Sequence, residues 1–247
     1  MDSIWPEAPA LRRPRILRQG WRDLTFLHWS VDPSEVANFF PPGVAPDTFE
    51  GRTYVGLVPF RMVDTGLAHG PAVPYWGTFL ETNIRLYSVD TSGRRGVVFL
   101  SLDADRLAVV AAARTVFGLP YRWARMTHVA DGNHHTYTST VRWPGVQAAS
   151  TIGVRTGQPL EPGPLEHFLT ARWGLHTRRA RRTWYLPNEH PPWSLHTAEL
   201  VRFDDQGLLA SVGLMGLTGP PNHVMYSPGV PAEFGLPFAA PGTPARP

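Results

Sequence analysis

Hydrophobic and polar residues alternate along much of the chain, and the alternation is clearest from Phe79 to Tyr87. Successive side chains of a β-strand point to opposite faces, so this pattern predicts a strand. One face is mostly apolar, and the other is mixed: Phe79, Glu81, Asn83, Arg85 and Tyr87. The mixed face fits an antiparallel strand with one solvent-exposed face, or a strand that lines the inside of a closed or half-closed β-barrel.

The segments that follow predict a hairpin and then a helix. Residues 90–93 read Asp-Thr-Ser-Gly, a composition typical of turns. Residues 97–102 are strongly apolar and predict the returning strand. Apolar residues then recur at helical spacing over 107–117, and Gly118 is typical of a helix end.

The start and the apolar stripe of this helix raise two expectations. Asp103 or Asp105 can cap its N-terminus. Arg114 lies on the apolar stripe, where a buried guanidinium without an acidic partner is strongly unfavourable. We therefore expect Arg114 to pair with Glu81, which lies one hairpin away in the sequence.

The rest of the pattern predicts an α+β fold that is mostly antiparallel β. Asp32, with Pro33 and Glu35, predicts a capped short helix, and Pro59 is expected at a strand edge or a bulge. No internal repeat or clear linker is present, so we expect a single domain over 1–247, with extended tails at 1–19 and 228–247. A second short helix is expected at 165–173, and further strands at 24–29, 54–63, 123–130, 135–143, 148–156, 177–186, 194–203 and 208–217.

Composition narrows the classes of function. The chain has 247 residues, of which 43% are hydrophobic, and it contains no Cys, which rules out disulfides and thiolate nucleophiles. No apolar run approaches the length of a membrane span, and no leader pattern is present, so we expect a cytoplasmic protein without a membrane partner. The net charge of +3 is modest, and we do not expect nucleic acid as a partner.

The clustered basic residues and histidines do not indicate nucleic-acid or metal binding. The run Arg178–Arg182 fits a solvated strand end better than a phosphate-binding site, because no nucleic-acid-binding motif accompanies it. His134, His135, His190 and His196 do not have the spacing of a metal site, so we expect no metal and no cofactor. The Gly-x-Ser-x-Gly elbow of serine hydrolases is also absent.

Several motifs together resemble the YqjF-like family, which is grouped with the acetoacetate decarboxylase-like superfamily. The resemblance extends over roughly residues 15–230 and implies a single β-barrel-like domain with a few short helices and a dimer or larger assembly. The motifs that carry it are DLTFLHWSVDPSEVANFFPPGV, TFEGRTYVGLVPFRM, FLETNIR, SLDAD with AAAR, GLPYRWARM, LEHFLTARW and HPPWSLHTAEL.

The resemblance also implies roles for individual residues. Decarboxylases of that superfamily carry an active-site Glu on a strand like that of Glu81, and a helix end like the segment around Arg114. A Gly-x-Pro-Lys-Lys segment follows, whose first Lys forms a Schiff base and whose second lowers the pKa of the first. The equivalent segment here is Gly-Leu-Pro-Tyr-Arg, so Tyr121 and Arg122 stand at the lysine positions. An N-terminal Arg of the decarboxylases matches Arg22.

The loss of these lysines excludes one mechanism. All 23 basic residues are Arg, and the chain contains no Lys. Imine formation requires a primary amine with an accessible neutral form, and Arg cannot provide one. Lysine-dependent decarboxylation is therefore excluded.

Two hypotheses of function remain open. In the first, the protein binds a small carbonyl, carboxylate or hydrophobic metabolite in a barrel cavity and catalyses no reaction. In the second, it is a lysine-independent lyase, hydratase, cyclase or isomerase in which Glu81 transfers a proton, Arg114 or Arg22 holds a carboxylate or enolate, and Tyr121 donates to an oxyanion. Six further residues are expected to contact the ligand: Arg22, Arg85, Arg122, Trp76, His190 and Trp193.

Overall fold

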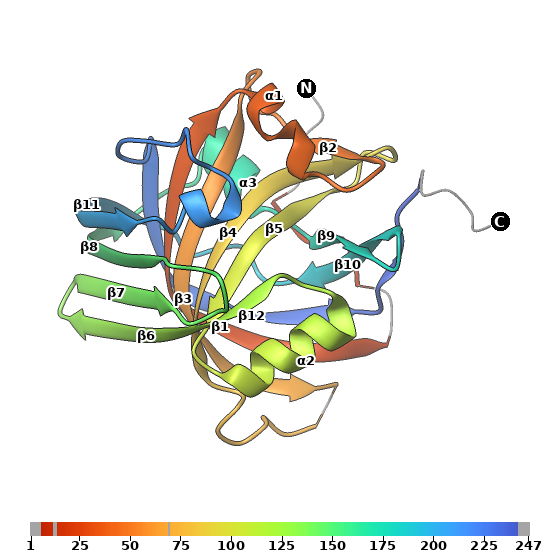
Figure 1. Cartoon of the computed structure of the whole chain (residues 1–247), viewed down its shortest axis with the longest axis horizontal. Helices are drawn as coiled ribbons and strands as arrows, with labels where there is room; N and C mark the ends of the chain where they lie inside the picture. Colours follow the sequence, from red (N-terminus) through yellow and green to blue (C-terminus); the bar gives the residue numbers. More distant parts are fainter. Residues whose placement is uncertain (1–5, 12–13, 69, 242–247) are drawn as a thin grey trace.

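The computed structural model describes residues 6–11, 14–68 and 70–241, and most of them lie in β-strands. Strands alternate with only a few short helices (Figure 1). In chain order the elements are β1 (Arg15–Val31), α1 (Pro33–Val36), the 3-10 helix η1 (Ala37–Phe39), β2 (Val44–Pro46), β3 (Thr53–Leu67), β4 (Phe79–Asp90), β5 (Arg95–Ala104), α2 (Leu107–Phe117), β6 (Tyr121–Asp131), β7 (His134–Val141), β8 (Ala149–Pro159), α3 (Pro164–Thr170), β9 (Gly174–Arg179), β10 (Arg182–Glu189), β11 (His196–Gln206), the 3-10 helix η2 (Ala210–Val212), β12 (His223–Gly235) and β13 (Phe238–Ala239).

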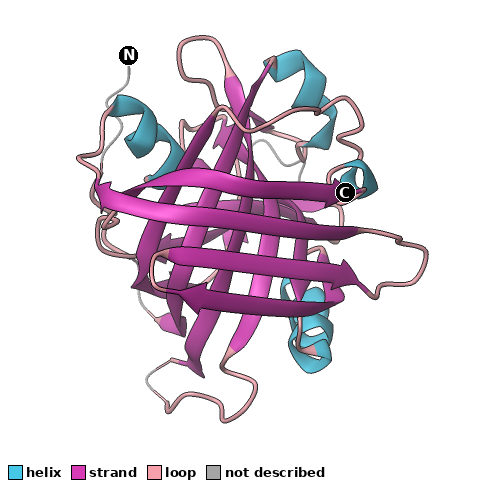
Figure 2. Ribbon diagram, turned by 90° about the vertical axis from the view of Figure 1, so that its left-hand side faces the viewer, coloured by secondary structure: helices cyan, strands magenta, loops and turns pink. Residues whose placement is uncertain are grey.

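Strand pairing closes part of the sheet into a ring, which we call the first ring. It runs through β12, β1, β3, β4, β5, β9 and β10, and it closes because β10 pairs with β12 and β5 pairs with both β4 and β9. The pairing is antiparallel except where β5 meets β6 and β9. The short strands β2 and β13 pair with β4 and β10, and strands β6, β7, β8 and β11 extend from β5 to β12. They face the viewer in Figure 2, where they cross over the strands behind them.

Two hydrophobic cores follow from this arrangement. The first core lies inside the first ring, because every strand of that ring contributes buried residues to it, and α3 adds Phe168 and Leu169. The second core lies between β1, β3 and β4 on one side and β7 and β8 on the other. Alternate residues of β4 therefore enter different cores: Tyr87 enters the first, whereas Ile84 and Leu86 enter the second.

Helix α2 ends where the sequence predicts but begins differently. Gly118 is the C-cap residue in the left-handed conformation, with φ of 67°. The predicted N-cap is wrong: Arg106 occupies that position, and no side chain caps the helix. Asp105 instead accepts a hydrogen bond from the backbone N–H of Leu80 and forms an ion pair with Arg106, so its carboxylate anchors the helix to β4.

Two other local predictions are confirmed. Asp32 and Glu35 form the capping box at the start of α1. Pro59 lies where the register between β1 and β3 shifts, between the Arg22 and Leu27 pairings. Proline has no N–H to donate to a sheet, so an interrupted ladder accommodates it.

Three predictions about strand boundaries are wrong. Residues 15–19 and 228–235, expected in tails, belong to β1 and β12, which pair with each other in the wall of the first ring. Residues 177–186 form a hairpin of two strands, because the chain reverses at Ala180 and Arg181, which both have positive φ. Residues 208–217 form η2 and turns rather than a strand, and residues 242–247 of the expected tail lie outside the described residues.

In the described part of the chain, no helix is both long and apolar enough to cross a membrane.

Candidate functional site

The candidate site is a row of polar side chains on the inward face of β4. Glu81, Asn83, Arg85 and Tyr87 alternate along this strand and therefore point to one side, toward the first core. Strand β4 is paired with β3 on one edge and β5 on the other, so its backbone hydrogen bonds fix the positions of these side chains. The row thus has the rigidity that a binding site requires.

Glu81 is a buried acid at one end of this row. It is 2% exposed, and its Oε2 accepts a hydrogen bond of 2.8 Å from the hydroxyl of Tyr121. Burial raises the pKa of Glu81 to about 8, although hydrogen bonds from Tyr121 and Asn83 oppose the rise. Glu81 is therefore mainly protonated at neutral pH and can both donate and accept a proton. The structure brings together Glu81 and Tyr121, two residues that the sequence singles out.

Arg85 is a partly buried cation farther along the row. Its guanidinium lies 5.5 Å from the ring centroid of Phe26 and 5.6 Å from that of Tyr87. Its Nη2 makes two long hydrogen bonds, of 3.3 Å to the Tyr87 hydroxyl and 3.4 Å to the carbonyl of Leu169. Its Nε is buried and has no partner among the described atoms, and no described carboxylate lies within ion-pair distance of Arg85.

The expected pairing of Arg114 with Glu81 is wrong. Arg114 is exposed on α2, where its Nη1 donates a 2.7 Å hydrogen bond to the carbonyl of Tyr121 and its guanidinium lies over the ring of Trp143. The stem of Arg114 runs along the surface, so the charge stays in water. Arg114 therefore holds the backbone of Tyr121 in place and does not enter the first ring.

Arg122 points away from the row because it follows Tyr121 in strand β6. Its Nε and Nη2 donate hydrogen bonds of 2.6 and 2.9 Å to the carboxylate of Asp103, and further hydrogen bonds reach the hydroxyls of Ser101 and Ser211. Arg122 is 7% exposed and Asp103 is fully buried. This guanidinium is fully engaged in an internal ion pair, so its expected contact with a ligand is not supported.

Arg22, His190 and Trp193 lie at or beside an open cleft and not in the row on β4. Arg22 and His190 line an open cleft of about 670 Å³ between β1, β10 and β12. Trp193 stacks on Trp21 and meets Phe26 edge to face, and His190 lies 4.9 Å from Trp193. Trp193 therefore packs against the first core beside Phe26, the same ring over which Arg85 lies. Burial lowers the pKa of His190 to about 4, so its ring is neutral.

Trp76 does not join the site. It is 52% exposed in the loop between β3 and β4, and the adjacent Tyr75 is 74% exposed. Its expected role in lining a cavity is not supported.

The structure adds residues that the sequence pattern did not single out. His28 of β1 is fully buried in the first ring, and its Nε2 lies 2.6 Å from the hydroxyl of Tyr87. Arg172, just beyond α3, pairs with Asp47 and lies over the ring of Tyr87. The alternation of Phe26 and His28 in β1 is the signal that could have placed His28 on the inward face.

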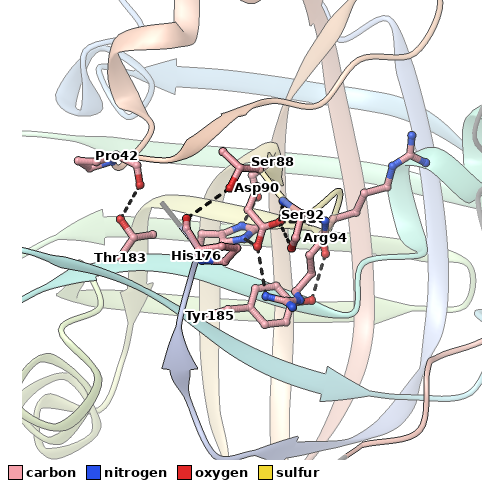
Figure 3. Close-up of polar contacts among 11 residues, drawn as sticks. Pro42, Ser88, Asp90, Ser92, Arg94, His176, Thr183 and Tyr185 are labelled. Atoms are coloured by element: carbon pink, nitrogen blue, oxygen red, sulfur yellow. Dashed lines mark hydrogen bonds and ion pairs between the residues drawn. The ribbon is translucent and has the colours of Figure 1, made fainter. Parts of the chain in front are cut away.

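A second buried polar cluster contains the residue types of a hydrolase triad but not its geometry (Figure 3). The hydroxyl of Ser88 lies 2.9 Å from Nδ1 of His176, whereas Nε2 of His176 is 3.6 Å from Asp90, beyond hydrogen-bond distance. Asp90 instead accepts hydrogen bonds from Ser92 and Arg94. All three triad-type residues are buried, and the cluster joins the β4–β5 turn to the β9–β10 hairpin. We assign it a structural role.

The basic run Arg178–Arg182 forms the tip of the β9–β10 hairpin. Arg179 donates hydrogen bonds to the carbonyls of Thr115 and Val116 at the end of α2. Positive side chains stabilise a helix C-terminus in this way. Among the described residues, no three His, Asp or Glu side chains are placed to hold a metal ion.

Sequence comparison places the chain in a family. Residues 18–231 match the DUF2071 family, which is described as an uncharacterized conserved protein. The chain belongs to this family. It is also 35% identical over 201 residues to the uncharacterized protein YqjF of Bacillus subtilis (strain 168), and the match covers 80% of this chain and 78% of the relative.

Solved structures show the same fold at low sequence identity. The enduracididine biosynthesis enzyme MppR complexed with pyruvate superposes with a TM-score of 0.63 at 16% identity, over 94% of this chain and 93% of the enzyme. An acetoacetate decarboxylase-like enzyme from Sphingomonas wittichii RW1 also gives 0.63, at 11% identity over 92% and 93%. Acetoacetate decarboxylase from Legionella pneumophila gives 0.55, at 16% identity over 94% and 90%. The fold is therefore that of acetoacetate decarboxylase-like proteins.

Proposed function

We propose that the protein binds a small metabolite with a carboxylate and a carbonyl group inside the first ring, without forming a covalent bond to it. Arg85 is the observation that carries this proposal. Its guanidinium faces the ring interior between Phe26 and Tyr87, its Nε has no partner, and no described carboxylate neutralises it. A partly buried cation of this kind is stabilised by an anion from outside the chain, and Arg binds carboxylates through paired hydrogen bonds.

The opposite end of the row suits the carbonyl group of the ligand. Glu81 is mainly protonated at neutral pH, because burial raises its pKa to about 8, and it is hydrogen-bonded to Tyr121. Asn83 lies between Glu81 and Arg85, and its Oδ1 is buried without a partner. The hydrogen of protonated Glu81 can be donated to an uncharged oxygen, and the free Oδ1 of Asn83 can accept a hydrogen bond, whereas Arg85 selects a negative oxygen.

The relatives support this class of ligand. MppR, which shares the fold, is complexed with pyruvate, a small 2-oxo acid. This chain has no Lys, so none of its side chains can hold such a ligand through a Schiff base. Binding through Arg85 and the Glu81–Tyr121 pair is the non-covalent equivalent.

A second function, proton-transfer catalysis, is favoured by one observation. The most effective general acid or base has a pKa near the working pH, and burial brings the pKa of Glu81 to about 8. Glu81 would then move a proton to or from the ligand, and the Tyr121 hydroxyl, which donates to Glu81 in this structure, would turn to donate to the developing oxyanion. The corresponding reaction is that of a lysine-independent lyase or isomerase.

A binding screen with three variants tests the proposal. Pyruvate and acetoacetate are titrated into the wild-type protein by calorimetry, and product formation is followed by NMR. We expect Arg85→Gln to weaken binding by about 10- to 100-fold, because a hydrogen bond to a charged group contributes about 1.5–3 kcal/mol. Arg202→Gln, which alters an exposed Arg of β11, is the matched control and should change nothing.

The two functions predict different results for the third variant, Glu81→Gln. If the protein is an enzyme, this variant binds ligand but forms no product. If it only binds, no product forms from any ligand, even with the wild-type protein. Saturable binding that survives Arg85→Gln would refute the site itself.

A further inference from the structure

We propose that one buried water molecule bridges Nδ1 of His28 and Nδ1 of His223 and completes a proton relay from the interior of the first ring to Glu166 near the surface. The argument for the water bridge uses only the two histidines and their neighbours and does not need a ligand. That the relay carries a proton released by a ligand rests on the proposed function.

The inner imidazole has a defined tautomer. The oxygen of Tyr87 accepts a hydrogen bond from Nη2 of Arg85, so the single phenolic hydrogen is directed to Nε2 of His28, 2.6 Å away. Burial, reinforced by the neighbouring Arg85, lowers the pKa of His28 well below its ordinary value, so the ring is neutral. Neutral imidazole has one N–H, which must then be at Nδ1. This Nδ1 is buried and has no partner among the described atoms.

The outer imidazole has the complementary tautomer. Nε2 of His223 lies 2.8 Å from Oε1 of Glu166. Burial acts to raise the pKa of Glu166, but hydrogen bonds from its helix start and from His223 outweigh it and hold the pKa below the ordinary value. Glu166 is therefore a carboxylate, and Nε2 of His223 donates to it. When this ring holds a single hydrogen, the lone pair is at Nδ1, and this atom is also buried without a described partner.

The two unpartnered atoms lie on neighbouring strands. His28 of β1 and His223 of β12 are directly opposite in the strand register, and their ring centroids are 6.2 Å apart. A buried polar atom without a protein partner usually binds ordered water. One water can accept from Nδ1–H of His28 and donate to Nδ1 of His223, with each hydrogen bond about 2.7–3.2 Å long.

The resulting chain has all its hydrogens oriented in one direction, from Tyr87 to Glu166. If each hydrogen moves one place, the Tyr87 proton passes to Nε2 of His28, the His28 Nδ1 proton passes to the water, a water proton passes to Nδ1 of His223, and the His223 Nε2 proton passes to Glu166. The oxygen of Tyr87 then takes the proton that the ligand releases, so protons balance and no electrons are transferred.

The neighbouring charges favour outward transfer. Arg85 and Arg172 both lie over the ring of Tyr87 and both disfavour a charged His28, whereas Glu166 is a partly exposed carboxylate. Asp47 is paired with Arg172 and partly offsets its charge. A proton is therefore less stable at the inner end of the chain than at the outer end.

NMR of the imidazole nitrogens tests the bridge without any ligand. In the wild-type protein at pH 7, we expect the Nδ1–H tautomer for His28 and the Nε2–H tautomer for His223. We also expect the His28 Nδ1–H to exchange with solvent despite its burial. The opposite tautomer, or a charged ring, at His28 overturns the proposal.

Two variants distinguish a relay from a purely structural contact. Glu166→Gln can keep the hydrogen bond that the N–H of Gly163 donates at the start of α3 but removes the carboxylate that accepts the proton, so the His28 tautomer should persist while its solvent exchange slows at least tenfold. His223→Phe removes the bridge and should slow the exchange as well. His196→Phe alters an exposed His of β11 and is the control. Unchanged exchange in a folded Glu166→Gln protein refutes the relay. A failure of ligand binding alters none of these readouts, so the two proposals fail separately.

Discussion

Replacement of Glu81 by Gln tests the central feature of the site, a buried carboxyl group that is neutral at physiological pH. Glu81 is 2% exposed, and burial raises its pKa from the ordinary 4.5 to about 8. The native state therefore binds this proton more tightly than the unfolded state does. Between pH 4.5 and 8 the unfolded chain releases the proton while the native protein keeps it, so stability falls as pH rises.

The size of the effect follows from the two pKa values. A difference of about 3.5 pH units corresponds to about 5 kcal/mol once both states are ionised. Linkage gives a loss of about 2.5 kcal/mol between pH 5 and pH 7 and about 1.4 kcal/mol more between pH 7 and pH 9. Gln has nearly the same shape but does not titrate. The free energy of unfolding of Glu81→Gln should therefore increase by these amounts relative to that of wild type as pH rises.

Urea unfolding at several values between pH 5 and pH 9 measures this directly. The free energy of unfolding of wild type is subtracted from that of Glu81→Gln at each pH, so that the titration of other groups cancels. Glu199→Gln serves as control, because this exposed Glu of β11 has only a surface ion pair with Arg155. Parallel curves for wild type and Glu81→Gln would show that Glu81 is ionised in the folded protein and would refute the reasoning.

Three further predictions concern residues that position the site. Arg122→Met should lower the free energy of unfolding by about 3–5 kcal/mol in urea unfolding, because Asp103 becomes a buried charge without a partner. Adding Asp103→Leu should restore much of the lost stability, and equal losses in the single and double variants would contradict the prediction. Tyr121→Phe should lower the free energy of unfolding, measured in the same way, by about 1–3 kcal/mol, because it removes the hydroxyl that is hydrogen-bonded to Glu81. An unchanged free energy of unfolding would mean that this hydrogen bond is not formed. Asp32→Ala should lower the stability measured by thermal unfolding by about 1 kcal/mol, because the capping box of α1 is lost. A change near zero would argue against that cap.

Features that depend on neighbouring residues could be predicted from the sequence. The alternation from Phe79 to Tyr87 predicts both the strand and its polar face, because side chains of a strand must alternate. The end of α2 at Gly118 follows from the ability of Gly to adopt positive φ. Pro and Gly content misled the prediction for residues 228–235, because the pairing with β1 and β10 outweighs the weak strand propensity of those residues.

The partners of the charged groups could not be predicted in the same way. Arg114 was matched to Glu81 because both carry charge and lie one hairpin apart. In the folded chain Glu81 faces Tyr121, while Arg114 lies on the outer side of α2. Tyr121 and Arg122 are adjacent, yet Tyr121 enters the first core whereas Arg122 points the other way and pairs with Asp103. A one-residue change in strand register would reverse both assignments, and the register is set by strands distant in the sequence.

The sequence by itself determined what side-chain chemistry is open to this protein, since a chain without Lys or Cys has no side chain that can form an imine or act as a thiolate, wherever its residues lie. Only the tertiary structure decided which groups meet. Closure of the first ring places His28 beside Tyr87, 59 residues away, and leaves Arg85 facing the interior with no carboxylate of the described residues paired to it. The properties of each side chain are local, but burial and pairing arise from contacts between distant segments, and these set the charge state of Glu81.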